Sequence, residues 1–318
     1  MNPLPVDVVV LCLDRMADTH ECIDSVRGQD HPDVRLWVLD QGSGRPMIEG
    51  LRVRARDEGF TFVEDGRTGV AAGRNHGYRM GSAPVIVALD NDAVLADPGV
   101  LTRAARRVGD DRRLGALAFA VHDYGRGGPD LGSWGYPWPA ATHFEREFLA
   151  ARFSGGGHAI ARKAFEETDG YDERLFFFGE ELDLSWQLIA AGYEIRYDPD
   201  VAVRHKSSLE RHLDWKGGRF YFNVRNMIYM NRKYLPGRGL PGAYAVGYLL
   251  KGVRNGMAGE AIRGIRDGLR LARESGGRKP LGDAARAYIE RYEYAPRGSA
   301  WQRILREVWP RLEQRRTP

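Results

Sequence analysis

The sequence predicts an α/β fold, in which a mostly parallel central sheet is flanked by helices and followed by a helical C-terminal region. Two short apolar runs, residues 6–13 and 85–89, have the composition of strands buried on both faces. Such runs alternate with polar, helix-like segments, which is the pattern of a doubly wound sheet. The charge changes further on, because residues 232–318 hold 19 Lys and Arg against 8 Asp and Glu, a net charge of +11 in a chain of +4. We therefore expect one domain over residues 1–215 and a basic, mainly helical region over residues 216–318.

The expected strands are short runs of aliphatic and β-branched residues that end at polar or glycine-containing turns. In chain order they cover residues 6–13, 34–39, 61–63, 85–89, 114–121, 193–197 and 201–203, and a glycine cluster within residues 153–162 enters a further strand. A chain of 318 residues has room for one large or two ordinary domains with a buried core.

The expected helices are polar or amphipathic segments with recognisable ends. Thr19 can cap the first of them, because its side-chain oxygen can accept a hydrogen bond from a free backbone N–H. Asp97 and Pro98 are typical of a helix start, and three acids in one turn favour another helix start within residues 176–188. The expected helices cover residues 19–26, 48–58, 97–108, 176–188, 219–230, 244–253 and 261–272.

The strand at residues 85–89 ends in Asp90, Asn91 and Asp92, which places two carboxylates one residue apart. Open α/β sheets bind ligands at this edge. Asp90 and Asp92 can hold a divalent cation through hard oxygen ligands, and the cation can hold a diphosphate. The alternative is an ordinary turn, since Asp and Asn favour turns.

Two further segments have features of a nucleotide site. Asp40 ends the second strand ahead of a Gly/Ser turn, where a carboxylate can accept hydrogen bonds from a nucleoside, and an ordinary turn is again the alternative. Residues 65–77 are rich in glycine and small residues, which lets the backbone approach a ligand closely before a helix begins. Arg74 adds a forked cation suited to phosphate. The segment is not a Walker A loop, which needs Gly-Lys-Ser/Thr.

Aromatic and acidic residues further along suggest acceptor binding and catalysis. Residues 124–142 form a loop rich in Gly, Pro and aromatics, in which Trp134 would stack on a sugar ring or pack within the loop. Glu180 and Glu181 begin a helix beside three phenylalanines, an apolar wall that would raise the pKa of a catalytic carboxylate. Stabilisation of the helix N-terminus is the other interpretation of these acids. His205 follows the last strand and is either structural or a ligand.

The composition and the N-terminal residues argue against a disulfide-rich, zinc-binding, secreted, membrane-spanning or nucleic-acid-binding protein. Cys12 and Cys22 have no zinc or disulfide spacing, which favours a reducing cytosol. The N-terminus lacks a signal-peptide pattern, and no apolar stretch reaches the roughly 20 residues of a transmembrane helix. The basic region has no nucleic-acid-binding motif. Its arginines flank a stripe of Ile262, Ile265 and Leu269, which would lie on the inner face of an anionic membrane or pack on the first domain.

In this order, the motifs resemble those of the family 2 glycosyltransferases, which have the Rossmann-like GT-A fold, and especially the bacterial branch that includes rhamnosyltransferases. The resemblance covers residues 6–205, roughly two thirds of the chain. It rests on Leu39-Asp40-Gln41-Gly42-Ser43, Gly69-Val70-Ala71-Ala72-Gly73-Arg74-Asn75-His76-Gly77, Asp90-Asn91-Asp92, Gly155-Gly156-Gly157 and Gly179-Glu180-Glu181-Leu182-Asp183-Leu184-Ser185-Trp186. Each segment is a weak signal alone, whereas their order and spacing are specific.

The resemblance implies a donor site assembled from several turns. The nucleotide-sugar contacts would be Asp40 at the nucleoside, Arg74 and Asn75 near the diphosphate, and Asp90 and Asn91 beside the ribose. The metal ligands of this DXD-type motif would be Asp92, Asp90 and His205. Mg²⁺ and Mn²⁺ both suit such a site. The family often has Thr/Asn-Tyr/Trp-Asn after the first strand, where this chain has Leu13-Asp14-Arg15.

The resemblance also implies the catalytic and acceptor residues. The family usually has Glu-Asp where this chain has Glu180-Glu181, and its Asp is the general base. Glu181 is therefore the candidate base, and Glu180 is the alternative. The acceptor contacts would be Trp134, Gly156, Gly157 and Asp183, of which Asp183 has a structural role as its alternative.

The implied reaction moves a sugar from a nucleotide diphosphate sugar to a hydroxyl of a cell-envelope glycan, a lipid-linked glycan or a natural product. A Lewis acid stabilises the leaving diphosphate and a single base activates the acceptor. We therefore expect an inverting, metal-dependent hexosyltransferase with no covalent glycosyl intermediate. Two alternatives stay open. A nucleotide-sugar pyrophosphorylase would favour a basic, Gly-rich loop after the first strand, and a non-catalytic nucleotide-sugar-binding module would lack the carboxylates.

Overall fold

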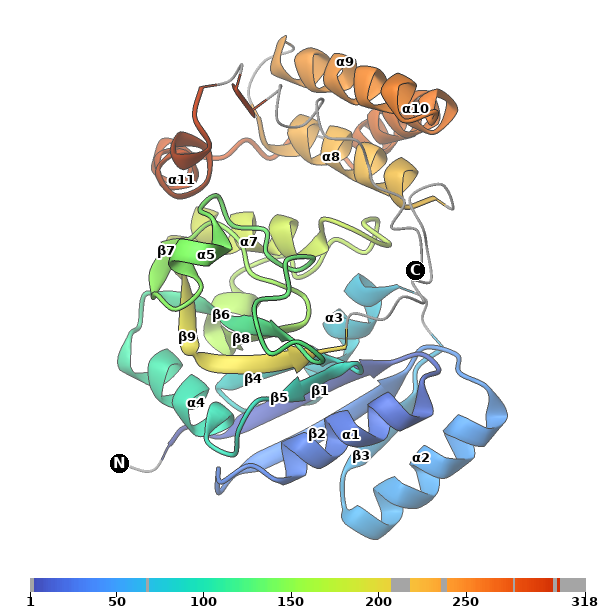
Figure 1. The fold of residues 1–318 in the computed structure, drawn as a ribbon, viewed down its shortest axis with the longest axis vertical. Coiled ribbons are helices and arrows are strands. Elements are labelled where there is room, and N and C mark those ends of the chain that lie inside the picture. The colour runs from blue at the N-terminus through green and yellow to red at the C-terminus, as the bar shows by residue number, and fades with distance from the viewer. Residues whose placement is uncertain are drawn as a thin grey trace. The chain divides into compact units, whose positions relative to one another are not determined.

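A computed structural model describes residues 3–66, 69–206, 218–235, 239–276, 278–299 and 302–303 (Figure 1). The chain divides into two compact units. The N-terminal unit consists of Met1–Phe176 and Glu180–Ser207, and the C-terminal unit consists of Phe177–Gly179 and Ser208–Pro318. The domain boundary expected between residues 215 and 216 lies outside the described residues.

The described part of the N-terminal unit is built on one nine-stranded sheet. Its strands are β1 (Val6–Cys12), β2 (Val34–Asp40), β3 (Thr61–Glu64), β4 (Val85–Asp90), β5 (Ala93–Leu95), β6 (Leu114–Asp123), β7 (Phe148–Ala150), β8 (Gly157–Ala161) and β9 (Glu194–His205). Their order is β3-β2-β1-β4-β8-β6-β9-β5, and β7 pairs with β9. The half formed by β3, β2, β1 and β4 is parallel, whereas β8 runs antiparallel to both β4 and β6.

Helices lie on both sides of this sheet (Figure 1). Those of the N-terminal unit are α1 (Met16–Arg27), α2 (Arg45–Glu58), α3 (Val70–Met80), α4 (Val100–Asp110), α5 (Ala140–His143), α6 (Arg162–Glu166) and α7 (Glu180–Ala190). Those of the C-terminal unit are α8 (Phe220–Tyr234), α9 (Gly239–Arg254), α10 (Ala258–Glu274) and α11 (Asp283–Ile289), followed by a π-helical turn (Glu290–Tyr294) and a 3-10 turn (Ala295–Arg297).

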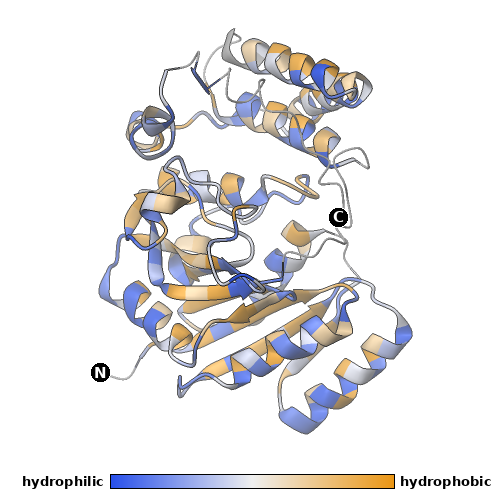
Figure 2. Cartoon of the chain, in the orientation of Figure 1, coloured by the Kyte–Doolittle hydropathy of each residue, from blue (hydrophilic) through white to orange (hydrophobic). Residues whose placement is uncertain are grey.

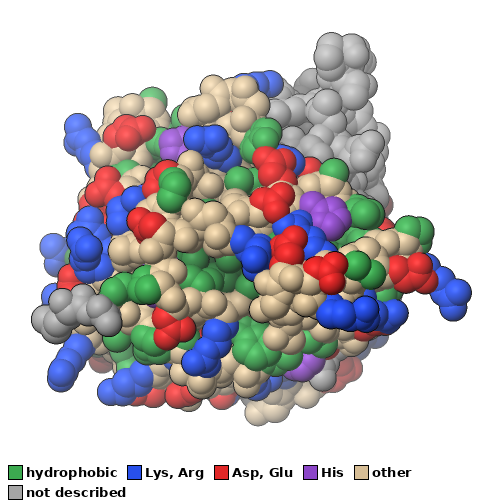
Figure 3. Space-filling model, turned by 90° about the horizontal axis from the view of Figure 1, so that it is seen from below, with side chains coloured by type: hydrophobic (Ala, Val, Ile, Leu, Met, Phe, Trp, Pro, Cys, Tyr) green, Lys and Arg blue, Asp and Glu red, His purple; other side chains and the backbone are tan. Residues whose placement is uncertain are grey.

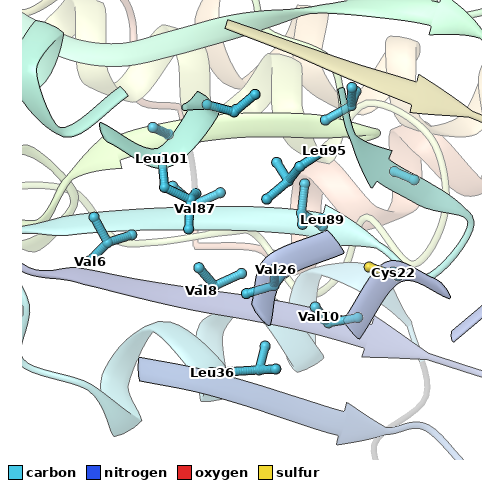
Figure 4. Close-up of a cluster of buried hydrophobic side chains, with 14 of the residues drawn as sticks. Val6, Val8, Val10, Cys22, Val26, Leu36, Val87, Leu89, Leu95 and Leu101 are labelled. Carbon is cyan, nitrogen blue, oxygen red and sulfur yellow. The ribbon is translucent and has the colours of Figure 1, made fainter. Parts of the chain in front are cut away.

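The alternating side chains of β1 explain how helices cover both faces. Val8 and Val10 belong to the same buried cluster as Cys22 of α1 (Figure 4). Val9 points to the opposite face, toward α3, where a Cβ added to Gly77 would lie 2.5 Å from Val9 Cγ1. Glycine at position 77 therefore lets α3 approach the sheet closely. β1 is buried along its whole length, as its continuous apolar sequence predicts.

The outer surfaces of α1 and α2 are polar, in contrast to the strands beneath them (Figure 2). Acidic and basic side chains are intermixed on the face of the molecule shown in Figure 3. Arg54 and Glu58 of α2, for example, form an ion pair of 2.9 Å. This pattern is that of solvated helices, with apolar faces turned to the sheet.

The structure differs from the sequence-based prediction in two informative places. α1 begins at Met16 rather than at Thr19, because Asp14 and Arg15 adopt left-handed backbone conformations (φ 53° and 56°) and turn the chain earlier. Thr19 is therefore not the cap, and its hydroxyl donates to the Arg15 carbonyl at 3.1 Å. The two short strands expected near the end of the unit are one continuous strand, β9, which follows β6 through register shifts.

The C-terminal unit has a core of its own where α8, α9 and α10 meet. The buried residues of this core are Phe220, Val224, Ile228, Tyr248, Met257 and Ala261. Ile265 and Leu269 of α10 pack against the core, whereas Ile262 is 57% exposed. Most of the stripe expected on α10 thus packs inside its own unit. Among the residues that the structure describes, none of the helices combines the length and apolar character that a membrane crossing requires.

Candidate active site

The acidic turn after β4 is positioned by strand pairing. β4 ends at Asp90, and the chain turns directly into β5, whose Ala93 lies opposite His205 of β9. Because Asp92 precedes Ala93, this pairing sets Asp92 beside His205. The backbone N–H of Lys206 also donates to the Asp92 carbonyl at 2.9 Å. Two of the three residues predicted as metal ligands, Asp92 and His205, are therefore neighbours.

Asp92 and His205 form the first part of the site. Asp92 Oδ1 lies 3.4 Å from His205 Nε2, and His205 Nδ1 lies 2.7 Å from Asp130 Oδ2. Burial lowers the pKa of His205, but the hydrogen bonds to Asp130 and Asp92 outweigh burial and raise it to about 10. Asp92 Oδ2 accepts a hydrogen bond from Arg15 Nη1 at 2.5 Å. Although burial opposes it, His205 and Arg15 together lower the pKa of Asp92.

Arg74 of α3 forms the centre of the second part. Its side chain is only 1% exposed. It donates to Glu181 Oε1 at 2.7 Å, to Asp90 Oδ1 at 3.0 Å and to the Gly155 carbonyl at 2.8 Å. One buried cation thus joins the end of β4, the glycine turn before β8 and the start of α7.

Asp90 connects the two parts of the site. Its side chain is 36% exposed, although it pairs with Arg74. Burial raises the pKa of Asp90, Arg74 lowers it and Asp92 raises it, with an upward shift as the result. Two neighbouring carboxylates repel each other, and a divalent cation placed between them removes that repulsion.

Glu180 and Glu181 begin α7 but have different surroundings. The two residues before the helix, Phe178 and Gly179, have left-handed conformations (φ 79° and 96°), which is unusual for a bulky residue such as Phe. Glu180 is buried, and its Oε2 has no hydrogen-bond partner within the described residues. Burial, followed by the charge of Glu181, raises the pKa of Glu180 well above its ordinary value. Glu181 is 19% exposed and is the member of the pair bound by Arg74.

The profile of one protein family, described as "Glycosyl transferase family 2", matches residues 7–169. The chain belongs to glycosyltransferase family 2, a family of transferase enzymes. This family 2 chain is 25% identical over 235 residues to a pre-mycofactocin glycosyltransferase of Mycobacterium tuberculosis, covering 68% of this chain and 46% of the relative. It is 25% identical over 250 residues to an N-acetylglucosaminyltransferase of Bradyrhizobium diazoefficiens, covering 68% and 49%. The chain thus spans about half the length of these curated relatives.

Solved structures share the fold of the family 2 chain. The mannosyltransferase PcManGT from Pyrobaculum calidifontis, in complex with GDP-Man and Mn²⁺, is 17% identical with a TM-score of 0.58, over 96% of this chain and 86% of that one. GalNAc-T7 with UDP, GalNAc and Mn²⁺ is 16% identical with a TM-score of 0.63, over 98% and 59%. These likenesses confirm the predicted GT-A fold. The narrower rhamnosyltransferase-like assignment stays a prediction.

Two residues predicted to contact the nucleotide stabilise turns of the family 2 domain. Asp40 is 1% exposed, and its carboxylate accepts the backbone N–H of Ser43 at 3.1 Å. The Asn91 side chain donates to the Asp14 carbonyl at 3.2 Å and to the Thr19 hydroxyl at 2.8 Å. Both residues therefore shape the loops at the sheet edge. Neither side chain is among the hydrogen-bond partners of Arg74, which include Asp90 and Glu181.

Asn75, Trp134 and Asp183 also lie in packed surroundings. Asn75 exchanges hydrogen bonds of 2.8 Å with the backbone of Tyr171. The Trp134 ring packs edge-on against Tyr136 and against Tyr197 of β9, and its Nε1 donates to a carbonyl of its own loop at 2.7 Å, so the packing alternative describes its surroundings. Asp183 is fully buried and accepts a hydrogen bond from Gln187 at 2.7 Å, which agrees with its structural alternative.

The glycine turn before β8 lies directly against the site. A Cβ added to Gly155 would be 2.4 Å from Glu181 Oε1, so glycine leaves room for the Glu181 side chain in this arrangement. Gly156 is the neighbour of His205, whose Cδ2 would be 4.0 Å from such a Cβ. Gly157 faces the packed interior of the sheet instead.

Sequence reasoning assigned no role in this site to three of its residues. Arg15 occupies one oxygen of Asp92, Asp130 orients His205, and Gly155 accepts a hydrogen bond from the central arginine. In the sequence, Arg15 was notable only because it stands in the segment after the first strand that departs from the family pattern. Asp130 is a single acid in a long irregular loop, where no periodicity or spacing indicates its partner.

The side chains beside Asp92 fit a divalent cation. Within the described ranges, no group of three His, Cys, Asp or Glu side chains is arranged to hold a metal ion by itself. Asp92 and His205 nevertheless offer a carboxylate oxygen and an imidazole nitrogen side by side. Asp130 binds the other imidazole nitrogen, as carboxylates commonly do behind a histidine ligand. Such a mixed donor set suits Mg²⁺ or Mn²⁺, with further positions left for oxygens of a bound diphosphate.

Replacing Arg74 with methionine should destabilise the N-terminal unit, because Asp90 and Glu181 lose their shared buried counter-ion. Removal of one partner from a buried ion pair costs about 3–5 kcal/mol, and the partial exposure of Asp90 places our expectation near the lower end. Urea unfolding measures the loss. Arg52→Met is the control, because the Arg52 side chain is 52% exposed, and exposed pairs contribute about 0–1 kcal/mol. Equal losses in the two variants would contradict a special role for Arg74.

Proposed function

We propose that the chain is an inverting, metal-dependent glycosyltransferase that moves a sugar from a nucleotide diphosphate sugar to an acceptor hydroxyl. The observation that carries the proposal is the convergence of Asp90 and Glu181 on Arg74, next to the Asp92–His205 pair. In this arrangement Asp92 and His205 would bind the cation, and the carboxylate of Glu181 would act as the base. Family membership and the GT-A fold support the same reading.

Asp92 and His205 would hold the divalent cation, with Asp90 as the neighbouring carboxylate. When bound, the cation supplies Lewis-acid stabilisation of the leaving diphosphate. The solved structures with the same fold contain Mn²⁺, and the oxygen-rich donor set also accepts Mg²⁺. Asp130 would keep the His205 ring in one orientation, so that Nε2 faces Asp92.

Glu181 is the proposed general base. Its carboxylate would take the proton of the acceptor hydroxyl, while the acceptor oxygen forms the new bond to the anomeric carbon. The bond to the diphosphate oxygen breaks at the same time, and that oxygen keeps the electron pair. A single displacement of this kind inverts the anomeric centre and needs no covalent glycosyl intermediate. Arg74 fixes the position of Glu181, and the buried Glu180 is poorly placed to reach an acceptor.

The remaining predicted contacts receive indirect roles in this proposal. Asp40 and Asn91 would shape the nucleoside end of the site through the turns they stabilise, and Asn75 would support the segment that carries Tyr171. On the acceptor side, Gly156 borders His205. Trp134 would support its loop rather than stack on the acceptor.

Metal affinity should rise with pH because of His205. The pKa of His205 is raised to about 10 in the metal-free fold. The protonated imidazole therefore stabilises this fold fully below about pH 6.5, and the stabilisation is lost as the pH rises through about 10. A histidine binds a metal through its neutral imidazole, so binding releases this proton. Calorimetry with Mg²⁺ between about pH 6.5 and 8.5, near the ordinary His pKa, should show tighter binding and proton release at higher pH. His205→Gln should remove the pH dependence, and a wild-type affinity that is flat over this range would contradict the assignment.

Arg15→Ala should tighten metal binding when no nucleotide is present. The Arg15 guanidinium holds Asp92 Oδ2, and this bond must break before a cation uses that oxygen. Hydrogen bonds to charged groups are worth about 1.5–3 kcal/mol, so we expect roughly tenfold tighter Mn²⁺ binding by calorimetry. Asp97→Ala, which removes a half-exposed charged side chain just after β5, serves as the control. Unchanged or weaker binding in Arg15→Ala would contradict the competition.

The proposed activity is tested by incubating the chain with UDP-, GDP- and dTDP-sugars and measuring release of the nucleoside diphosphate, with and without metal. Hydrolysis of one donor only with metal supports the proposal, and NMR of the released sugar should show the inverted anomer. Formation of a nucleoside triphosphate from donor and pyrophosphate would instead favour the pyrophosphorylase alternative. Binding of a donor without turnover would favour the non-catalytic alternative.

A further inference from the structure

The helix α9 carries an apolar face that points away from the core of the C-terminal unit. We call it the α9 stripe; it consists of Val246, Leu249, Leu250 and Val253, which are 58%, 36%, 52% and 62% exposed. Steps of three and four residues place them on one side of the helix. The opposite side is packed, because Tyr248 is buried in the core and a Cβ added to Gly252 would lie 2.8 Å from Ala261.

The composition of α9 makes an uncovered stripe unusual. Its 16 residues contain two charged side chains, Lys251 and Arg254, and both lie in the last turn. A helix that is apolar on all sides is normally covered on all sides. Among the residues that the structure describes, the core of the C-terminal unit packs on the inner side. The four residues of the stripe offer aliphatic carbon and no side-chain hydrogen-bonding group, and the exposed Arg254 follows them at the end of the helix. The stripe itself therefore suits an apolar partner rather than one that forms specific hydrogen bonds.

The C-terminal unit that carries the stripe is basic. Arg263, Arg266 and Arg270 on the adjoining α10 have side chains that are 60%, 71% and 64% exposed. Acids of α10 pair with them, yet residues 232–318 keep an excess of +11. Positive charge of this size disfavours contact between two copies and favours an anionic surface. An exposed aliphatic helix face combined with exposed arginines in the same unit is typical of proteins that bind at a membrane interface.

We propose that the α9 stripe is a membrane-contact site, which enters the boundary between headgroups and acyl chains of an anionic bilayer. At a rise of 1.5 Å per residue, the helix is about 24 Å long, shorter than the roughly 30 Å hydrocarbon core. α9 therefore lies along the membrane surface rather than across it. The arginines of α10 contact the anionic headgroups. The site uses none of the residues of the proposed donor site.

Vesicle flotation of the full chain tests this site. Vesicles of phosphatidylcholine with about 30 mol% phosphatidylglycerol should bind the chain at least roughly tenfold more strongly than phosphatidylcholine alone. Raising the salt from about 0.1 M to about 0.5 M should weaken the binding, because salt screens the headgroup charge. The double change Val246→Asp and Leu250→Asp should lower binding by roughly tenfold or more. Both side chains point away from the core, and circular dichroism melts check that the variant stays folded.

Two control variants separate this site from a general effect and from the proposed function. Val53→Asp places the same change on the exposed face of α2, where Val53 is 53% exposed, and should bind vesicles like the wild type. Asp92→Ala should do so too, even though donor binding is lost. Equal binding to both vesicle types, or equal losses in Val53→Asp and the double variant, would overturn the proposal. A wild-type dimer in light scattering that the double variant converts to monomer would assign the stripe to a second copy instead.

Discussion

Asp92→Ala is expected to lose metal-dependent donor binding and roughly 10³-fold in kcat/KM. Asp92 is the carboxylate next to His205, and its removal leaves the imidazole as the main protein ligand. A bound metal ion contributes several kcal/mol of transition-state stabilisation, and each 1.36 kcal/mol corresponds to a factor of ten in rate. Calorimetry with Mn²⁺ and a nucleoside diphosphate measures the binding, and donor hydrolysis measures the rate.

Asp97→Ala is the matched control for this prediction. Asp97 lies just after β5 and pairs with Arg103 at 2.7 Å, with 47% of its side chain exposed. The control should keep the affinity and the rate of the wild type. Metal-dependent donor binding that survives in Asp92→Ala would place the cation elsewhere in the acidic cluster.

Glu181→Gln is expected to lower the rate of donor hydrolysis by roughly 10²–10⁴-fold, the range that general bases contribute. The amide keeps the size of the side chain and one oxygen for Arg74, so donor affinity should change little. In donor hydrolysis, water takes the place of the acceptor hydroxyl and needs the same base. Single-turnover measurement with saturating donor separates this rate from binding.

Glu180→Gln is the partner experiment, because it changes the neighbouring carboxylate in the same way. The raised pKa of Glu180 means that the wild type loses stability as pH rises above the ordinary value of 4.5, since the unfolded state gives up that proton first. Glutamine resembles the protonated acid, so Glu180→Gln should keep the rate and abolish this loss of stability. The reverse outcome, a slow Glu180→Gln and a fast Glu181→Gln, would make Glu180 the base.

Local sequence patterns predicted the parts of the molecule that depend on short segments. The apolar run before Asp90 and the polar turn after it are visible in seven or eight consecutive residues, and both occur in the structure. The α/β class and the family follow from the same kind of signal. A strand was also predicted after the glycine cluster, where β8 lies, but its antiparallel place between β4 and β6 was not, because strand order depends on pairings between residues far apart in the chain.

The contacts of the site were harder to predict for a related reason. Arg74 was expected near the diphosphate, but its three partners in the structure could not be predicted, because they come from segments 16 to 107 residues away. Asp130 orients His205 across 75 residues. In the C-terminal unit the sequence indicated an apolar stripe on α10, but the packing of α8 and α10 covers much of it and leaves α9 exposed. No periodicity in a single helix shows which of its neighbours will cover it.

Thermal stabilisation by a panel of nucleoside diphosphates, with and without Mn²⁺, tests the proposed donor site most directly. A ligand that binds the folded state must raise its stability. We expect one nucleotide to raise the melting temperature of the wild type only when Mn²⁺ is present, and Asp92→Ala to show no such rise. A panel in which no nucleotide shifts the wild-type melt, with or without metal, would contradict a donor site at Asp90, Asp92 and His205.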